Sequence, residues 1–217
     1  METGISNAPS QNVAKVRNRG FEFALTHRNT IGEVSYMVSA NIATNNNEIT
    51  DLSSSNDIIN NLENGHGVAK YILREGESIG SFYGFESDGL YTQEEIDAGH
   101  YYTYGGVTPN AGDTKFVPQR ELDWGEEITD SDRTIIGCEV PDFTYGINLS
   151  VNYKNFEFSI FGQGICGADV AFEVYQVHPF FHGQDNPRRY HMGRWSEENP
   201  NPHAIYPRIY TASSPHT

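Results

Sequence analysis

Long hydrophobic runs are missing from this sequence, and so is the cysteine density of a disulfide scaffold. No stretch of about 18 apolar residues occurs, which excludes a transmembrane helix. The two cysteines, Cys138 and Cys166, are too few for a zinc site or a disulfide framework, and we expect both to be small, partly buried residues. The first residues also lack the basic and apolar regions of a secretory signal peptide. We therefore expect either a cytoplasmic protein or a mature or partial piece of an exported one.

Basic residues are scarce as well. The 217 residues include 14 Lys and Arg against 29 Asp and Glu, which gives a formal net charge of -15. A chain this acidic repels phosphate backbones, so we expect no nucleic-acid partner. Hydrophobic residues make up only 37%, yet the chain has 13 Tyr, 12 Phe and 21 Gly. This composition predicts an all-β fold with long polar loops.

Catalytic motifs are also absent. The sequence contains no GxSxG, no HExxH and no P-loop, and we expect no enzymatic activity. His178 and His182 have the spacing of two zinc ligands on a helix, but Pro179 argues against a helix that presents both. We therefore expect no histidine metal site.

The clearest pattern that is present lies between residues 142 and 165. If the chain turns at Lys154-Asn155, Tyr153 lies opposite Phe156 and Leu149 opposite Ile160, so that one face is apolar and the other polar. Cys166 then falls opposite Phe143 rather than Cys138, which argues against a disulfide. Each arm has about ten residues, the length of a tilted strand that crosses a bilayer. A long hairpin of a soluble sandwich is the alternative.

A second hairpin of the same design is predicted at residues 20–44. Pairing Arg28 with Glu33 across a short loop places Leu25 opposite Tyr36 and Phe23 opposite Val38. This pairing also predicts a cross-strand ion pair between Arg28 and Glu33.

The rest of the chain is expected to be loops. Residues 1–19 are a polar lead-in, residues 45–141 form a long excursion between the hairpins, and residues 167–217 are rich in proline. A short strand is predicted at 67–74, one or two helical turns at 92–98 from the capping box Thr92–Glu95, and a short helix near residues 173–177. Short loops that alternate with long excursions are typical of outer-membrane barrels.

Several segments in order carry a family likeness. They are NRGFEFAL at 18–25, NNNEITDL at 45–52, REGESIGSFYGFESDGLY at 74–91, AGD at 111–113, DRTIIG at 132–137, PDFTYGINLSVNYKNFEFSIFGQG at 141–164 and RWSEENPN at 194–201. Together they resemble the C-terminal part of SusC/RagA-type TonB-linked outer-membrane proteins.

The resemblance implies a fold and a function. The fold is all-β, with antiparallel strands of a partial outer-membrane β-barrel, long irregular outer loops and a short helical turn. Residues 20–166 would be the barrel segment and residues 167–217 a truncated outer-loop region. The whole protein would import a glycan or a peptide, energised by TonB through an N-terminal plug absent here, under a SusD-like surface lipoprotein. We expect the fragment alone not to transport anything.

Three sets of candidate site residues follow. The lipid-facing set comprises Phe21, Phe23, Leu25, Tyr36, Val38, Leu149, Val151, Phe158 and Ile160. The ligand-binding set, whose rings could stack on a sugar or simply pack the excursion, comprises Tyr101, Tyr102, Tyr104 and Trp124. The metal set comprises Asp123, Glu126, Asp130 and Asp132, where the family often has a calcium-type loop. A solvated acidic loop is the competing interpretation of this last set, and no other cofactor is expected.

Two functions from different classes remain at this point. The first is a segment of a TonB-dependent nutrient transporter whose apolar hairpin faces meet lipid. The second is a free-standing soluble β-sandwich that binds carbohydrate, in which the same faces form a dry core between two sheets.

Overall fold

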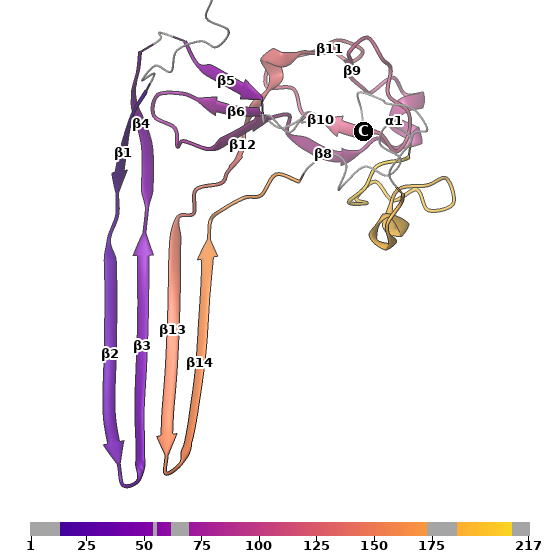
Figure 1. Cartoon of the computed structure of the whole chain (residues 1–217). Coiled ribbons are helices and arrows are strands. Elements are labelled where there is room, and N and C mark those ends of the chain that lie inside the picture. Colours follow the sequence, from indigo (N-terminus) through magenta and orange to yellow (C-terminus); the bar gives the residue numbers. More distant parts are fainter. Residues whose placement is uncertain (1–13, 54–55, 62–69, 173–185, 210–217) are drawn as a thin grey trace, which may run out of the picture. The chain divides into compact units, whose positions relative to one another are not determined.

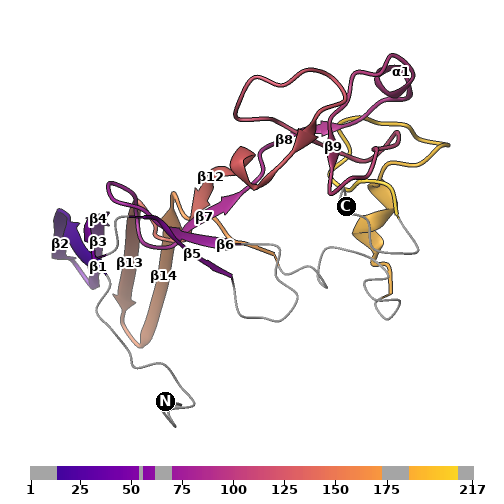
Figure 2. The ribbon, with the colours of Figure 1, turned by 90° about the horizontal axis from the view of Figure 1, so that it is seen from above.

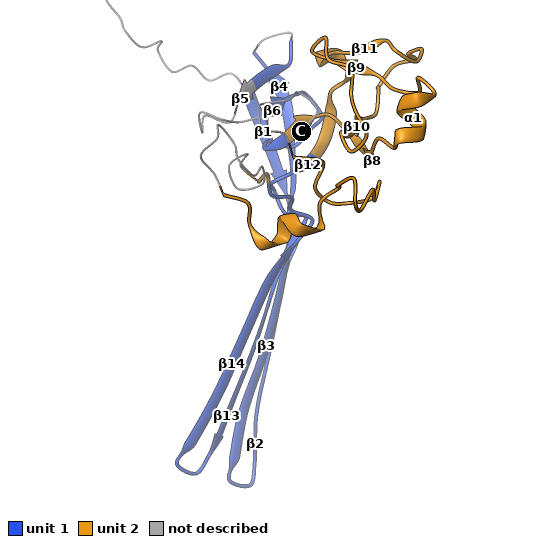
Figure 3. Ribbon diagram, turned by 90° about the vertical axis from the view of Figure 1, so that its right-hand side faces the viewer, with its two compact units in different colours: residues 1–59, 72–81, 137–170 blue, residues 60–71, 82–136, 171–217 orange. Residues whose placement is uncertain are grey.

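The computed structural model describes residues 14–53, 56–61, 70–172 and 186–209. Their secondary structure is almost entirely β, with one α-helix, α1 (Gln93–Asp97), and short 3-10 helices at Asp130–Asp132 and Arg189–Gly193. None of the described helices is long and apolar enough to cross a membrane. The chain divides into two compact units, unit 1 with residues 1–59, 72–81 and 137–170, and unit 2 with residues 60–71, 82–136 and 171–217 (Figure 3).

Unit 1 contains a long four-stranded sheet in the order β14–β13–β3–β2. Its strands are β2 (Glu22–Ile31), β3 (Val34–Thr44), β13 (Phe143–Tyr153) and β14 (Phe156–Cys166), and all three pairings are antiparallel (Figures 1 and 2). Each strand has ten or eleven residues, about twice the usual length in soluble proteins. We call these four strands the long sheet.

The hairpin β13–β14 confirms the predicted register. Lys154 and Asn155 form its two-residue turn, Tyr153 pairs with Phe156, Leu149 with Ile160, and Cys166 with Phe143. Lys154 has a φ of 52°, the left-handed conformation that such tight turns require. Both cysteines are free.

The predicted register of the first hairpin was wrong. Ile31 pairs with Val34, so the turn is the two residues Gly32 and Glu33 rather than a four-residue loop. Gly32 has a φ of 62°, a conformation that glycine adopts without steric cost and that allows this shorter turn. The register shifts by four residues, an even number, and every side chain therefore stays on the predicted face. The predicted Arg28–Glu33 ion pair does not form, because Glu33 pairs instead with Lys154, at 3.1 Å.

The lead-in proposed for residues 1–19 contains a strand. β1 (Ala14–Arg19) pairs antiparallel with β4 (Asn46–Leu52). In the chain, β1 directly precedes β2, and β4 directly follows β3. Polar cross-strand contacts, Lys15 to Asp51 and Arg17 to Glu48, occupy this pair. The polar residues that suggested a lead-in lie at exposed positions of this strand pair, while Ile49 and Leu52 of β4 are buried.

The excursion at residues 45–141 has structure of its own. It contains β5 (Ile58–Asn61), β6 (Lys70–Leu73), β7 (Ser81–Gly84), β8 (Ser87–Leu90), β9 (Thr103–Tyr104), β10 (Thr114–Phe116), β11 (Glu127–Ile128) and β12 (Thr134–Cys138). β12, β7, β6 and β5 form a four-stranded sheet in that order, β10 pairs antiparallel with β8, and β11 pairs parallel with β9. The predicted strand at 67–74 corresponds to β6, and the predicted helical turns to α1.

Buried side chains are few and local. In unit 1, Ile49, Leu52 and Ile72 are buried, all outside the long sheet. In unit 2, Leu90, Ala111 and Trp195 form a small core that Ala204 joins. Residues 186–209 of the proline-rich region thus supply core residues to unit 2. The helix predicted near residues 173–177, and His178 and His182, lie outside the described residues.

Candidate functional site

The long sheet carries one exposed apolar face. The pairing aligns Phe23 with Ile42, Tyr145 and Gly164 in one row, and Tyr36 with Val151 and Phe158 in another. Phe23, Leu25, Phe158 and Ile160 are each more than half exposed, and Phe21 is exposed beside the sheet. The predicted lipid-facing set therefore shares one face, with no second sheet over it among the described residues.

Two polar side chains interrupt this face on the edge strand β2. His27 falls in the row of Val38, Leu149 and Ile160, and Asn29 in the row of Tyr36. The ring Nε2 of His27 lies 3.2 Å from the Tyr36 hydroxyl, so this imidazole has a hydrogen-bond partner on the same face.

The opposite face of the long sheet is mainly polar. It carries Asn41, Asn148, Ser150, Gln163 and Glu157, while Phe161 and Ile165 are its exposed apolar exceptions. Gly146 on this face lies so close to the Asn41 side chain that an added Cβ would be 2.5 Å from its Oδ1 atom. Apart from these exceptions, one face of the long sheet is apolar and the other polar.

The predicted aromatic residues fall into two separate groups in unit 2. The Trp124 ring stacks on Tyr102, with centroids 4.9 Å apart and planes at 28°, and lies 5.2 Å from the ring of His100. Trp124 is 55% exposed. We call His100, Tyr102 and Trp124 the aromatic platform.

Tyr104 belongs to the other group. It contacts the rings of Phe85 and Phe116 edge-on, and the Arg133 guanidinium lies 4.1 Å from the Phe85 ring centroid. These rings pack against each other within the unit. Tyr101 contributes its backbone carbonyl, which accepts a hydrogen bond from Gly125 at 2.7 Å.

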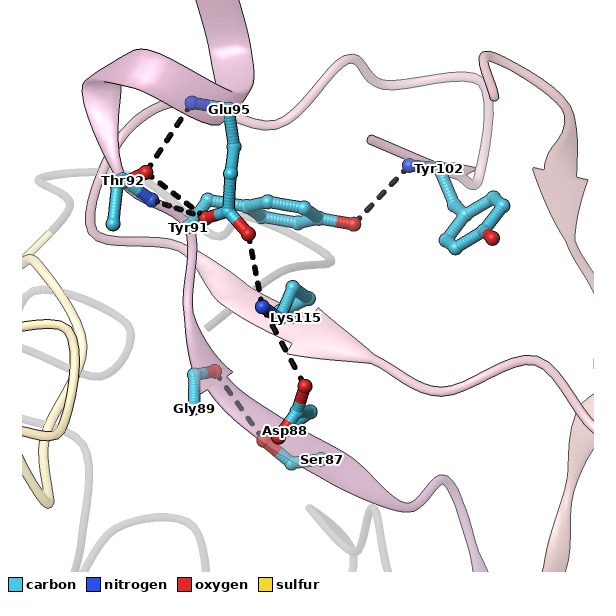
Figure 4. Close-up of polar contacts among 8 residues, drawn as sticks. All are labelled: Ser87, Asp88, Gly89, Tyr91, Thr92, Glu95, Tyr102 and Lys115. Carbon is cyan, nitrogen blue, oxygen red and sulfur yellow. Dashed lines mark hydrogen bonds and ion pairs between the residues drawn. The ribbon is translucent and has the colours of Figure 1, made fainter. Parts of the chain in front are cut away.

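Backbone hydrogen bonds hold the aromatic platform in place. Trp124 lies at the corner of a turn in which the Glu126 amide donates to the Asp123 carbonyl, and Gly125 has a φ of 89°. The Tyr102 amide donates to the hydroxyl of Tyr91 at 3.1 Å (Figure 4). Tyr91 is fully buried, and burial raises the pKa of its phenol. A buried, neutral phenol therefore fixes the backbone from which the platform projects.

A polar network fixes the helix next to Tyr91. The Thr92 hydroxyl accepts a hydrogen bond from the Glu95 amide, and the Glu95 carboxylate accepts one from the Thr92 amide, which is the predicted capping box (Figure 4). Lys115 donates to Glu95 at 3.0 Å and lies 3.6 Å from Asp88. Burial raises the pKa of the Glu95 carboxyl, but hydrogen bonds from Thr92 and Lys115 outweigh it and leave the pKa below its usual value.

The predicted metal set does not converge. Asp132 is fully buried and accepts hydrogen bonds from the Thr129 amide at 2.9 Å and from Arg120 Nε at 3.2 Å, and Asp130 pairs with Arg133 at 2.7 Å. Burial raises the pKa of the Asp132 carboxyl, but the hydrogen bonds from Thr129 and Arg120 and the Arg120 charge outweigh it and leave the pKa below its usual value. In the described ranges, no three His, Cys, Asp or Glu side chains are arranged to hold a metal ion.

Sequence reasoning missed the roles of His100 and Asp113. His100 directly precedes the predicted tyrosines, and this adjacency was the available signal. Asp113, buried, accepts a hydrogen bond from the Asn110 amide at 2.8 Å, and its backbone carbonyl accepts one from Tyr91. Gly112 beside it faces Trp195, with an added Cβ only 2.3 Å from the indole. The AGD segment thus has a structural role in unit 2.

Comparison with known proteins identifies the class. No protein-family model matches the chain. The chain is 33% identical over 210 residues to the TonB-dependent receptor P3 of Formosa agariphila, and 30% identical over 205 residues to the TonB-dependent receptor P26 of that organism. These alignments cover 95% and 92% of this chain. This chain is a homologue of part of a TonB-dependent receptor.

The solved structures agree on the fold. A structure of the RagAB peptide transporter matches 95% of the chain with a TM-score of 0.66 at 21% identity, and one of the RagAB peptide importer in the closed-closed state matches with a TM-score of 0.61 at 20% identity. The chain spans about a fifth of the length of the receptors and of the transporter chains it matches. The resemblance to TonB-linked outer-membrane proteins seen in the sequence is thus confirmed.

Proposed function

We propose that this chain supplies wall strands and outer loops to a TonB-dependent outer-membrane receptor that imports a nutrient, either a glycan or a peptide. The hairpins at 20–44 and 142–165 would cross the outer membrane as part of a β-barrel. Residues 45–141 and 167–217 would lie on the outer side. Transport is proposed for the whole receptor and not for this segment alone.

The exposed apolar face of the long sheet carries this proposal. Strands of ten or eleven residues rise about 33 Å along their axis, enough to cross the hydrocarbon core when tilted. Large apolar side chains on one face and polar ones on the other match the alternation of lipid-facing and lumen-facing residues in barrels. In water, a face of this extent would favour association.

The edges of the long sheet support the same proposal. β2 and β14 each have one strand neighbour within the sheet and leave the hydrogen-bonding groups of their outer edges unused by it. Unpaired edges are excluded from lipid, because a backbone group without a partner in hydrocarbon costs several kcal/mol. Neighbouring strands of a larger barrel would satisfy both edges.

Two partners are proposed for the whole receptor. TonB would energise it, and a SusD-like lipoprotein would cover the outer side, by analogy with the two-component RagAB transporter. Of the predicted ligand-binding residues, we propose Tyr102 and Trp124 as ligand contacts, since Tyr104 packs within the unit. No observation favours the soluble sandwich, because the described residues contain no sheet that covers Phe23, Leu25 and Phe158.

Spin labels test the membrane assignment. A label is placed at Leu149 and, separately, at Ser150, two neighbours on opposite faces of β13, in the chain or its full-length receptor in bilayers. We expect high accessibility to oxygen at Leu149 and high accessibility to a water-soluble nickel chelate at Ser150. Low accessibility to both reagents at Leu149 would mean a protein core and would refute the barrel assignment.

A further inference from the structure

The segment at residues 82–136 combines strong negative charge with one exposed tryptophan. It contains twelve acidic and only three basic residues. Each of the three bases already has a carboxylate partner, Lys115 with Glu95, Arg120 with Asp132 and Arg133 with Asp130. The surplus carboxylates therefore have no basic residue of this segment left to neutralise them.

The same segment shows how it holds a cation. The Arg133 guanidinium lies 4.1 Å from the centroid of the Phe85 ring and 2.7 Å from the Asp130 carboxylate. An aromatic face and a carboxylate together thus bind one internal positive charge. The attraction arises because the ring quadrupole is negative over its face and the carboxylate adds a full charge.

Trp124 is an exposed aromatic ring that is close in sequence to two carboxylates and that contacts the rings of Tyr102 and His100. The indole of Trp124 is 55% exposed. Among the aromatic side chains, indole binds cations best. Asp123 and Glu121, within three residues of Trp124 in the sequence, are exposed carboxylates. In the described residues, no Lys or Arg lies over this ring. Stacking on Tyr102 and the turn at Asp123–Glu126 hold the indole, so little conformational entropy would be lost on binding.

We propose that Trp124, with the Asp123 and Glu121 carboxylates, binds a positively charged group of an incoming solute, an ammonium or a guanidinium. The group could belong to a lysine or arginine side chain of a peptide or to an unacetylated amino sugar. The charge of the segment disfavours anionic solutes at this place. The inference deepens the proposed function and rests on it for the solute that reaches these loops.

The test measures binding of dye-labelled trilysine to the full chain in a non-ionic detergent, by fluorescence anisotropy. Because one cation–π contact is worth about 0.5–2 kcal/mol, Trp124→Leu should weaken binding about 2- to 30-fold, whereas Trp124→Tyr, which keeps an aromatic face, should stay within about 3-fold. Asp123→Asn should also weaken binding, and Glu197→Gln, an exposed carboxylate elsewhere in unit 2, should not. Tyr at position 124 keeps the test valid if the Leu variant fails to fold.

Unlabelled competitors identify the source of the charge. Trilysine or a glucosamine trimer should displace the label, and whichever competes better identifies the peptide or the amino sugar. Equal competition by acetylated trilysine or by an N-acetylglucosamine trimer would show that charge is not recognised and would overturn the proposal. Unchanged affinity in Trp124→Leu would also overturn it, since binding would then be general attraction to acidic residues. If Leu149 showed low accessibility to oxygen while trilysine binding was intact, the barrel assignment would be refuted and the proposed cation site would stand.

Discussion

The long sheet and unit 2 bury their side chains in different ways. In the four strands of the long sheet, Gly146 is the one buried residue, and large apolar side chains such as Phe23 and Phe158 are exposed. Unit 2 instead buries Tyr91, Asp132 and Trp195 and fixes them with hydrogen bonds and short-range packing. The long sheet leaves its apolar face exposed, and in the proposed barrel lipid would cover that face while neighbouring strands would pair with its edges. Unit 2 carries a small interior of its own.

This difference predicts opposite sensitivities to substitution. In the long sheet, the face that a residue occupies should decide the effect. In unit 2, burial and hydrogen bonding should decide it. The predictions below compare the two regions, from the largest expected effect to the smallest.

Leu149→Arg should be the most damaging change in the long sheet. An arginine on the lipid face near the middle of a strand costs about 2–4 kcal/mol in folding free energy, because the charge must leave water. Ser150→Arg, one residue away on the polar face, should cost little. The measurement is urea unfolding in lipid vesicles, and equal loss in the two variants would contradict the assignment of faces.

Asp132→Ala should be the most damaging polar change in unit 2. It removes the acceptor of the Thr129 amide and of Arg120, and leaves these donors without it. We expect a loss of about 2–3 kcal/mol in unfolding free energy. The loss is moderate because Arg120 is partly exposed, so that water can solvate its charge when the carboxylate is removed. The exposed Glu121→Ala is the control, and hydrogen exchange at Thr129 localises the effect.

The same carboxylate gives unit 2 an acid sensitivity. The pKa values of Asp132 and Glu95 are lowered by folding, so their stabilisation is fully present above the unfolded values of about 4 and is lost as the pH falls through the folded values. Unit 2 should therefore lose stability below about pH 4. Asp132→Asn should flatten the pH dependence of the unfolding free energy. An unchanged dependence would argue against a lowered pKa of Asp132 in the folded protein.

Gly112→Ala should destabilise unit 2 by about 2 kcal/mol or more, through a strained φ of 86° and a clash with Trp195. Gly125→Ala is the matched control, with a similar φ of 89° and nothing within 4 Å of the added Cβ. The difference in unfolding free energy between the two variants measures the clash alone. Equal losses would show that strain, and not packing against Trp195, decides the effect.

Thr92→Ala should have the smallest effect, about 1 kcal/mol, typical of a lost N-cap. The Glu95 amide loses its acceptor, while the Lys115–Glu95 ion pair remains (Figure 4). Faster hydrogen exchange at the Glu95 amide is the expected readout. Thr92→Ser keeps the hydroxyl and should behave like the parent.

Local patterns predicted the hairpins and the helix because their information is local. Alternation of apolar and polar residues fixes the face of each strand, and Lys154-Asn155 and the Thr92–Glu95 box fix a turn and a helix start within four residues. The register of β2 on β3 was missed because a shift of four residues leaves every side chain on the same face of the sheet. The two registers differ only in the turn that joins the strands. The conformation of Gly32 decided between them.

The sequence by itself thus determined the strand faces, the capped helix and, through its segments in order, the likeness to TonB-dependent receptors. The tertiary structure alone decided that Trp124 stacks on Tyr102 and contacts His100, that Tyr104 packs with Phe85, and that Asp132 pairs with Arg120. These contacts join residues a dozen or more positions apart, on loops and very short elements. No periodic pattern relates such residues, because their contacts depend on the paths of the connecting segments and not on the geometry of a helix or a strand.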